Sequence, residues 1–422
     1  LPSRRLRRAR PCAKFPGVSR DAGHCCAIRM PRIVRSGGLP HAIRTLLVVL
    51  VLAIGAGCGD DPGPTEAPPA AEVRESAEAA EQLDTSAYAG VQRCASCHAE
   101  QVVAWRGSHH DRAMEIASRE VLLAPFEGER LETEGQWWRF LREGDRFVVE
   151  RGEGAQTLER LEVAYGFGVW PLQQLLVERE RGRFQVLPVG WDSRPAEEGG
   201  GRWFAFPEGP ALPPGDPLHW EGLAGNWNSQ CASCHSTALE KGYLPAEDRF
   251  ETRFAEIDVG CEACHGPGLA HADAYSKGKG EQGDQGALPV RFDPFRSDAW
   301  QRAPGARIAS RVLPRSVDVQ LDVCAPCHAL RSPLLDVADA GTPFLDSHRP
   351  RLMEPGLYFD DGQIHEEVYV WGSFLQSRMA GAGVRCNDCH DPHSLSVRRE
   401  GNALCTGCHA PEAFDGPDHH GH

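Results

Sequence analysis

Six copies of one short cysteine–histidine pattern dominate the chemistry that this sequence can perform. Each copy has two cysteines separated by two residues, with a histidine directly after the second cysteine. Two thiols at this spacing can add to the two vinyl groups of one porphyrin while the adjacent imidazole reaches the iron, which is how a c-type haem is attached. In chain order, motifs 1 to 6 are Cys94-Cys97-His98, Cys231-Cys234-His235, Cys261-Cys264-His265, Cys324-Cys327-His328, Cys386-Cys389-His390 and Cys405-Cys408-His409.

The repetition weighs against three other interpretations, because twelve of the sixteen cysteines fall in these motifs. A zinc site needs two cysteine pairs around one metal and gives no reason for a histidine after every second cysteine. A thioredoxin-like dithiol expects a single motif on a βαβ unit, and disulfides between cysteines so close in sequence would close strained loops. The sequence therefore predicts six covalently bound haem c groups, each with its iron on the histidine of its own motif.

The second axial position of each iron needs a further ligand. Met114, Met353 and Met379 could serve, but each is interpreted as core packing. His109 and His110 stand in a Gly-Ser-His-His turn after a helix expected at Glu100–Trp105; an axial ligand is favoured over a solvated loop, and the choice between the two stays open. The histidines that remain outside the motifs and the leader are His109, His110, His219, His271, His348, His365, His393, His419, His420 and His422.

The elements around the motifs are expected to be mainly α-helical with extensive loops built around packed c-type haems, because porphyrins supply core surface and the 45 Gly and 32 Pro fit a loop-rich chain. Residues 88–127 form a first haem segment and residues 207–422 the multihaem cytochrome c domain. Between them, residues 128–206 contain no Cys and no His. Strand-like runs separated by turn residues predict an inserted antiparallel β module here, which covers or docks rather than conducts. These runs are Trp137–Leu141, Phe147–Glu150, Leu158–Phe167, Leu172–Val177 and Phe184–Trp191.

The start of the chain is interpreted as a leader and signal sequence over residues 1–57, with Met30 as the true initiator. Arginines precede the thirteen-residue run Thr45–Gly57, which is too short for a membrane span and has the length of an export-signal h-region. Small residues stand directly before Cys58, as in a bacterial lipoprotein signal whose cysteine carries the lipid; an ordinary cleaved signal and an uncleaved anchor are the alternatives. Residues 58–87, rich in Pro, Ala and Glu, predict a flexible tether. We therefore expect lipid anchoring on the periplasmic side of the cell envelope.

The charge of the mature region limits its partners. Residues 58–422 hold 34 Lys or Arg and 58 Asp or Glu, a net charge of −24. Such a chain repels nucleic acid and anionic membrane surfaces and attracts a partner with a basic face. The expected partners are other cytochromes or a membrane quinol-linked complex, with membrane contact through the lipid anchor only. The oligomeric state is left open.

The motifs in their contexts resemble those of bacterial multihaem cytochromes c with doubled CXXCH motifs, which include the tetrahaem cytochrome linked to hydroxylamine oxidoreductase and relatives fused to tetratricopeptide repeats. The matching stretches are Cys94–His98 with Trp105–His110, Gly190–Pro195, Gly215–Trp220, Cys261–Gly268, Asp361–Ile364 and Cys386–His393. The resemblance implies distal ligation by His109 or His110, His219, His271 and His393. The remaining irons would draw on the His419–His422 cluster, chiefly His419 and His420, or on His348 and His365.

Electron transfer is the expected function, because two axial histidines close an iron to substrates. The chain departs from the resembling family after His422, where relatives commonly continue into another haem motif and helical repeats, so no role of such repeats is assigned. The alternative is a multihaem oxidoreductase that acts on a small nitrogen or sulfur compound at one five-coordinate haem. None of the six motifs replaces its histidine by the lysine found at the catalytic haem of pentahaem nitrite reductases.

Overall fold

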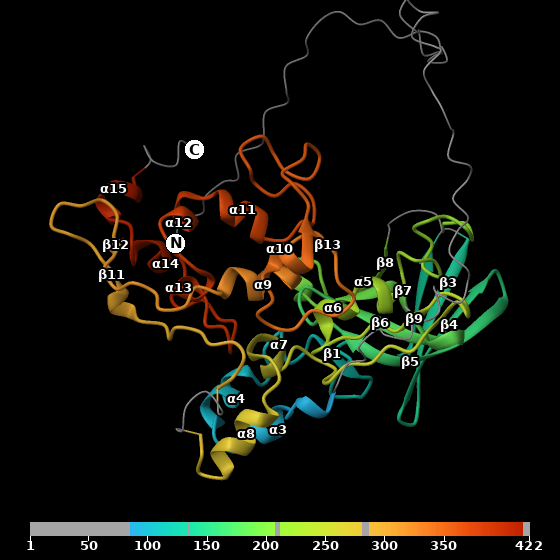
Figure 1. The fold of residues 1–422 in the computed structure, drawn as a ribbon. Coiled ribbons are helices and arrows are strands. Elements are labelled where there is room, and N and C mark those ends of the chain that lie inside the picture. Colours follow the sequence, from blue (N-terminus) through green and yellow to red (C-terminus); the bar gives the residue numbers. More distant parts are fainter. Residues whose placement is uncertain (1–84, 134, 207–211, 281–286, 417–422) are drawn as a thin grey trace, which may run out of the picture. The chain divides into compact units, whose positions relative to one another are not determined.

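A computed structural model describes residues 85–133, 135–206, 212–280 and 287–416 (Figure 1). The predictions for the leader, for Cys58, for nearly all of the tether and for His419, His420 and His422 lie outside these residues. Helix makes up 25% of the structure and strand makes up 27%, so the expectation of a mainly α-helical fold is wrong. The motif segments are short turns and loops, and the largest regular element is a sheet.

The helices are short because haem attachment needs a single helical turn. Residues i and i+3 of a helix lie on one face, so one turn already places two cysteines side by side. The helices are α3 (Val91–Ala95), α4 (Ala99–Trp105), α5 (Trp227–Gln230), α6 (Ala232–His235), α7 (Cys261–His265), α8 (Leu269–Ser276), α9 (Gln320–His328), α10 (Phe344–Ser347), α11 (Trp371–Gln376), α12 (Arg378–Gly381), α13 (Cys386–Cys389), α14 (Ala403–Thr406) and α15 (Pro411–Phe414), with 3-10 turns η1 (Thr85–Ala87), η2 (Glu180–Gly182), η3 (Ala196–Glu198) and η5 (Ser297–Ala299). Within the described part of the chain, no helix combines the length and apolar character needed to cross a membrane.

An eight-stranded antiparallel sheet, green in Figure 1, nearly closes into a barrel. Its hydrogen-bonded path follows the chain from β2 to β8, and β1 pairs with β5. The strands are β1 (Met114–Ile116), β2 (Glu127–Thr133), β3 (Gln136–Glu143), β4 (Arg146–Glu153), β5 (Gln156–Phe167), β6 (Leu172–Arg179), β7 (Arg183–Asp192) and β8 (Arg202–Ala205). The five predicted strand-like runs fall within β3 to β7. However, β1 belongs to the first haem segment, so the sheet is not confined to residues 128–206.

Three two-stranded hairpins lie in the haem-motif part of the chain. They are β9 (Tyr243–Leu244) with β10 (Arg249–Phe250), β11 (Trp300–Gln301) with β12 (Ser310–Arg311), and β13 (Arg331–Pro333) with β14 (His348–Pro350). Each is too short to bury a core of its own, so the hairpins serve as local connections between motif segments.

One face of the sheet buries an aromatic core. The rings of Phe140 and Trp203 stack nearly parallel with centres 3.5 Å apart, and Phe126 meets both edge-on. Inward residues alternate along every strand, as the period of a β-strand requires. The buried members are Leu122, Ala124, Phe126, Trp138, Phe140, Phe147, Val149, Leu161, Val163, Leu175, Val177, Leu187, Val189, Trp203 and Trp220. Trp138, Trp203 and Trp220 are therefore core residues.

The opposite face of the sheet packs against motif 2. Leu176 of β6 and Val186 of β7 form a second buried cluster with Met114, Trp227 and Ala232. Ala232 stands between the two cysteines of motif 2 and is 0% exposed, and Met114 is core, as predicted. Because the same strands are buried on both faces, the sheet supports a haem motif directly and is more than a cover.

Buried amides fasten α5, which leads into motif 2, to strand β7. The Asn226 side chain caps α5 by accepting from the Ser229 amide at 3.1 Å, and its Nδ2 donates to Gln185 Oε1 at 2.9 Å. Asn228 Oδ1 accepts from the Phe184 amide at 2.9 Å. Since these buried polar groups are paired, their contacts fix motif 2 on the sheet.

Candidate haem centres

All twelve motif cysteines are free thiols, as addition to porphyrin vinyl groups requires. Motifs 2, 3 and 4 lie on α6, α7 and the end of α9. Motifs 1, 5 and 6 begin on α3, α13 and α14 and continue into the following turn. The donor set of every motif therefore fits haem c: two thiols about one helical turn apart and an imidazole directly after them.

Motif 1 lies beside motif 3, and motif 2 lies beside motif 4. A hydrogen bond between the thiols of Cys94 and Cys261 lowers the pKa of Cys94 and raises that of Cys261. A second thiol pair joins Cys234 and Cys327, lowering the pKa of Cys234 to about 6 and raising that of Cys327. Motifs that are far apart in sequence are thus brought together in pairs.

Motif 4 also touches motif 5, which lies near motif 6. A hydrogen bond with Cys386 of motif 5 is the largest cause of the raised pKa of Cys324, to which the charge of Cys264 in motif 3 also contributes. Burial raises the pKa of Cys389 in motif 5, and the charge of Cys408 in motif 6 adds to this. The six motifs therefore form one connected series, 1-3-4-5-6, with motif 2 beside motif 4.

Two pairs of imidazole rings face each other across gaps that would hold an iron. The ring centres of His98 and His271 are 6.2 Å apart with planes 24° apart, and those of His110 and His328 are 6.3 Å apart with planes 53° apart. An imidazole nitrogen binds a metal at about 2 Å, so two rings on opposite sides of one ion have centres roughly 6 Å apart. These pairs fit axial ligation of the haems at motifs 1 and 4.

His110 is the member of the His109–His110 pair that the structure places opposite a motif histidine. It is half-buried, whereas His109 is exposed. The Val259 amide, just before motif 3, donates to the His110 carbonyl oxygen at 3.1 Å. Burial, followed by the charges of His328 and His109, lowers the pKa of His110 to about 4. The ring is therefore neutral at neutral pH and can offer a nitrogen lone pair.

His393 lies near motif 3. Burial lowers the pKa of His265, and the charges of His393, His98 and His271 lower it further. The Asp391 carboxylate accepts from the His393 amide at 3.0 Å and so shapes the Asp-Pro-His turn. His393 remains a predicted distal ligand, and it is close enough to His265 of motif 3 for its charge to act on that ring.

His235 of motif 2 is oriented by the first haem segment. Its Nδ1 lies 2.7 Å from the Ala113 carbonyl oxygen, and Phe167 meets the ring edge-on with centres 5.3 Å apart. When Nδ1 carries the ring proton and donates a hydrogen bond to a carbonyl oxygen, Nε2 keeps its lone pair. This is the usual arrangement of a metal-binding histidine.

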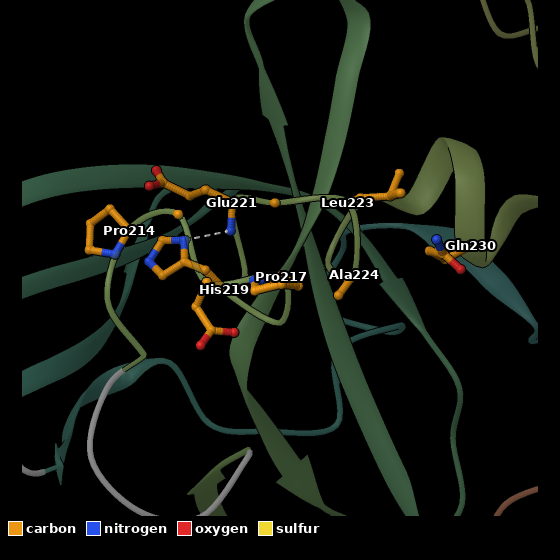
Figure 2. A pocket seen from close by; sticks show the side chains of 10 residues that line it. Pro214, Pro217, His219, Glu221, Leu223, Ala224 and Gln230 are labelled. Carbon is orange, nitrogen blue, oxygen red and sulfur yellow. Dashed lines mark hydrogen bonds between the residues drawn. The ribbon is translucent and has the colours of Figure 1, made fainter. Parts of the chain in front are cut away.

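His219 lines a pocket of about 710 Å³ formed by the segment that precedes motif 2, together with Glu221, Leu223 and Gln230 (Figure 2). Its Nδ1 accepts from the Glu221 amide at 3.2 Å, so the ring proton is on Nε2. In this arrangement the ring offers the pocket a donor instead of a lone pair. Ligation by His219 therefore stays a prediction that would require this hydrogen bond to break.

His348 and His365, the reserve ligands, lie in different surroundings. His348 is buried, its ring stacks on Phe344, and its Nδ1 lies 2.8 Å from Ser347 Oγ. Burial and the charge of Arg331 lower its pKa to about 4, so it too is neutral. His365 lines a second pocket, of about 670 Å³, and its Nδ1 lies 3.0 Å from the Gly356 carbonyl oxygen.

Arg331 bridges motifs 2 and 4. Its Nε donates to the Pro326 carbonyl oxygen at 2.7 Å, and its Nη2 donates to Ser233 Oγ at 2.9 Å. Ser233 and Pro326 are spacer residues between the two cysteines of their motifs. The sequence around Arg331 does not reveal this bridging role, because its two partners lie more than ninety residues apart along the chain.

A spacer residue of motif 5, Asp388, is the acceptor of a buried cluster. Its carboxylate accepts from Arg315 Nη2 at 2.7 Å, from Trp300 Nε1 at 3.1 Å and from the Arg385 amide at 2.8 Å. The side chains of Arg315 and Asp388 are 9% and 10% exposed. The ion pair therefore holds motif 5 against the segment that follows β12.

Known families match the chain at its motifs. The model for cytochrome c554 and c-prime matches residues 93–124 and 222–266, on either side of most of the sheet. The model for the doubled CXXCH motif matches residues 379–414. No curated protein matches the chain.

One solved structure is similar to this chain, that of the outer cell wall cytochrome OcwA, at 16% identity and a TM-score of 0.43. The alignment covers 75% of this chain and 58% of that one, so the chain spans less than two thirds of that protein's length. The two family matches include residues of motifs 1, 2, 3, 5 and 6. They support a multihaem cytochrome c that carries covalently bound haem.

Proposed function

We propose that this chain is an exported cytochrome c that carries six haem c groups and passes electrons between redox partners at the cell envelope. The observation that carries the proposal is that six attachment motifs form one connected series, with facing histidine pairs at motifs 1 and 4. A haem iron between two histidines exchanges single electrons without binding substrate. The chain's own residues hold the motifs together: Arg331 joins motifs 2 and 4, and Asp388 fixes motif 5.

The partners and the location follow from charge and from the leader. A net charge of −24 over residues 58–422 favours partners with a basic docking face, such as other cytochromes or a membrane quinol-linked complex, and disfavours nucleic acid. The export signal and the small residues before Cys58 support a lipid-anchored protein on the periplasmic side. Bis-histidine ligation makes the chain a carrier.

The haem count tests the cofactor proposal. Protein matured in a host that attaches c-type haem should contain six haems by intact mass and by the pyridine haemochrome assay, because all six motifs keep both thiols free. The matched control replaces Cys405 and Cys408 with serine, which removes one attachment site near the end of the chain and should lower the count by one. Four or fewer haems in the unaltered protein would contradict the proposal. One full equivalent of high-spin haem that turns over nitrite or hydroxylamine would favour the oxidoreductase alternative.

Membrane attachment is tested at Cys58. Replacing Cys58 with serine removes the thiol that would carry the lipid, so the protein should move from the membrane fraction to the soluble periplasmic fraction, with its haem count unchanged. A Cys26→Ser variant is the control, because that cysteine precedes the expected initiator. Unchanged membrane attachment of the Cys58 variant would exclude the lipid anchor.

A further inference from the structure

Glu262 is a spacer residue of motif 3, yet its contacts are made with the segments that carry motif 1 and His271. The side chain is 3% exposed. Its Oε1 accepts from the Ala89 amide at 2.8 Å and from the Gly268 amide at 2.6 Å, and its Oε2 accepts from the Gly90 amide at 2.8 Å. One carboxylate therefore satisfies three backbone donors from two segments about 180 positions apart.

Both segments open a helix. Gly90 directly precedes α3, and its φ of 76° lies in the region that favours glycine. Gly268 directly precedes α8. A Cβ at Gly268 would lie 3.2 Å from Glu262 Oε1, so the carboxylate is closely packed against this turn. Glu262 thus fixes where α3 and α8 begin.

These helices carry the two histidines that face each other at motif 1. α3 holds Cys94 and leads into His98, and α8 holds His271. The rings of His98 and His271 lie with centres 6.2 Å apart and planes 24° apart. A shift of either helix start would change this separation directly, because each histidine is within nine residues of the amides that Glu262 binds.

We propose that Glu262 is a positioning residue for the haem attached at motif 1: it sets the separation of that haem's two axial histidines while belonging to a different haem's motif. This inference rests on the proposed function, since it takes motif 1 to carry a haem. The carboxylate acts through the backbone amides at the starts of α3 and α8. It also couples motif 1 to motif 3, whose helix α7 it belongs to.

Two other contacts between these segments are weaker candidates for the same role. Arg93 of α3 pairs with Asp273 of α8 at 2.6 Å, but both side chains are more than 40% exposed, and solvent screens such exposed pairs so that they contribute little. The Glu256 carboxylate accepts from the Val91 amide of α3 at 2.8 Å. This hydrogen bond does not reach α8, so it cannot link the two helices. The Arg93–Asp273 pair therefore supplies a matched control on the same helices.

The test compares Glu262→Ala, Glu262→Gln and Asp273→Asn in the full haem-loaded chain. Glu262→Ala leaves three amides without their acceptor, so we expect about one equivalent of high-spin haem by EPR and a new carbon monoxide complex, with the haem count unchanged. Glu262→Gln keeps one acceptor oxygen and should give a smaller change, and Asp273→Asn should leave every haem low-spin. Adding His271→Ala to Glu262→Ala should produce no further high-spin haem beyond His271→Ala alone, because both act on the same iron.

The outcomes separate this inference from the proposed function. A haem count of four or fewer in the unaltered protein counts against the proposed function, whatever Glu262 does. A full haem count, with all haems low-spin and all potentials unchanged in Glu262→Ala, overturns the positioning role even if the variant is less stable. If Glu262→Ala does not accumulate, a shift of one haem's EPR g values and potential in Glu262→Gln supports the role, and their constancy overturns it.

Discussion

Replacing His110 with alanine is expected to convert about one haem per molecule from low-spin to high-spin and to create a carbon monoxide binding site. The reason is geometric: the ring of His110 faces that of His328 with centres 6.3 Å apart. Removing one of two facing imidazoles leaves an axial position open to exogenous ligands. EPR of the oxidised protein and optical titration of the reduced protein with carbon monoxide would measure the change.

His109→Ala is the matched control, because His109 is the exposed neighbour in the same turn. It should leave all haems low-spin. If His109→Ala opens the iron and His110→Ala does not, the ligand assignment at motif 4 is reversed. If neither variant changes any haem, neither residue is a ligand.

Replacing Asp388 with alanine is expected to lower the free energy of unfolding by about 3–5 kcal/mol, because it strips the partner from a buried cation. Arg315 would keep its charge at 9% exposure, and the Trp300 indole and the Arg385 amide would lose their acceptor. Denaturant unfolding of the haem-loaded chain, followed by far-ultraviolet circular dichroism and by the Soret band, would measure the loss. Asp388→Asn, which can still accept, should cost less.

Asp298→Ala is the control for this variant. Asp298 pairs with Arg296 at 2.7 Å, but both side chains are more than half exposed, so its loss should leave the free energy of unfolding nearly unchanged. Equal effects of the two substitutions would show that the Asp388 cluster gives no special support to motif 5.

The sequence located the strands and the attachment motifs well, because both follow local patterns. Alternating apolar residues predict β3 to β7, and the cysteine spacing identifies each motif. The mainly α expectation failed because a haem motif needs one turn of helix, so six motifs add few helical residues. β1 could not be predicted, since Met114–Ile116 is too short to show a period and joins the sheet by pairing with the end of β5, some fifty residues later in the chain.

The pairing of motifs and ligands could not be read from the sequence for a different reason. His109 and His110 are adjacent and chemically identical, and only tertiary burial separates them. Glu262, Ser233 and Asp388 occupy spacer positions that haem attachment leaves free, so the pattern that identifies a motif says nothing about their contacts. Arg331 has partners on two distant motifs, and distance along the chain hides such a bridge.

The contact between Ala89 and Glu262 spans 173 positions, and most of the sheet lies inside that loop. A chain exported from its N-terminus presents the cysteines of motif 1 first, while Glu262 and His271 emerge much later. Motifs 5 and 6, in contrast, follow each other within a few tens of residues. Folding of the sheet shortens the loop that must be closed, and long loops cost entropy until that happens. Under the proposed export, the first haem site to leave the membrane would therefore be among the last to receive its full set of supports, and its completion would wait on the β-strands.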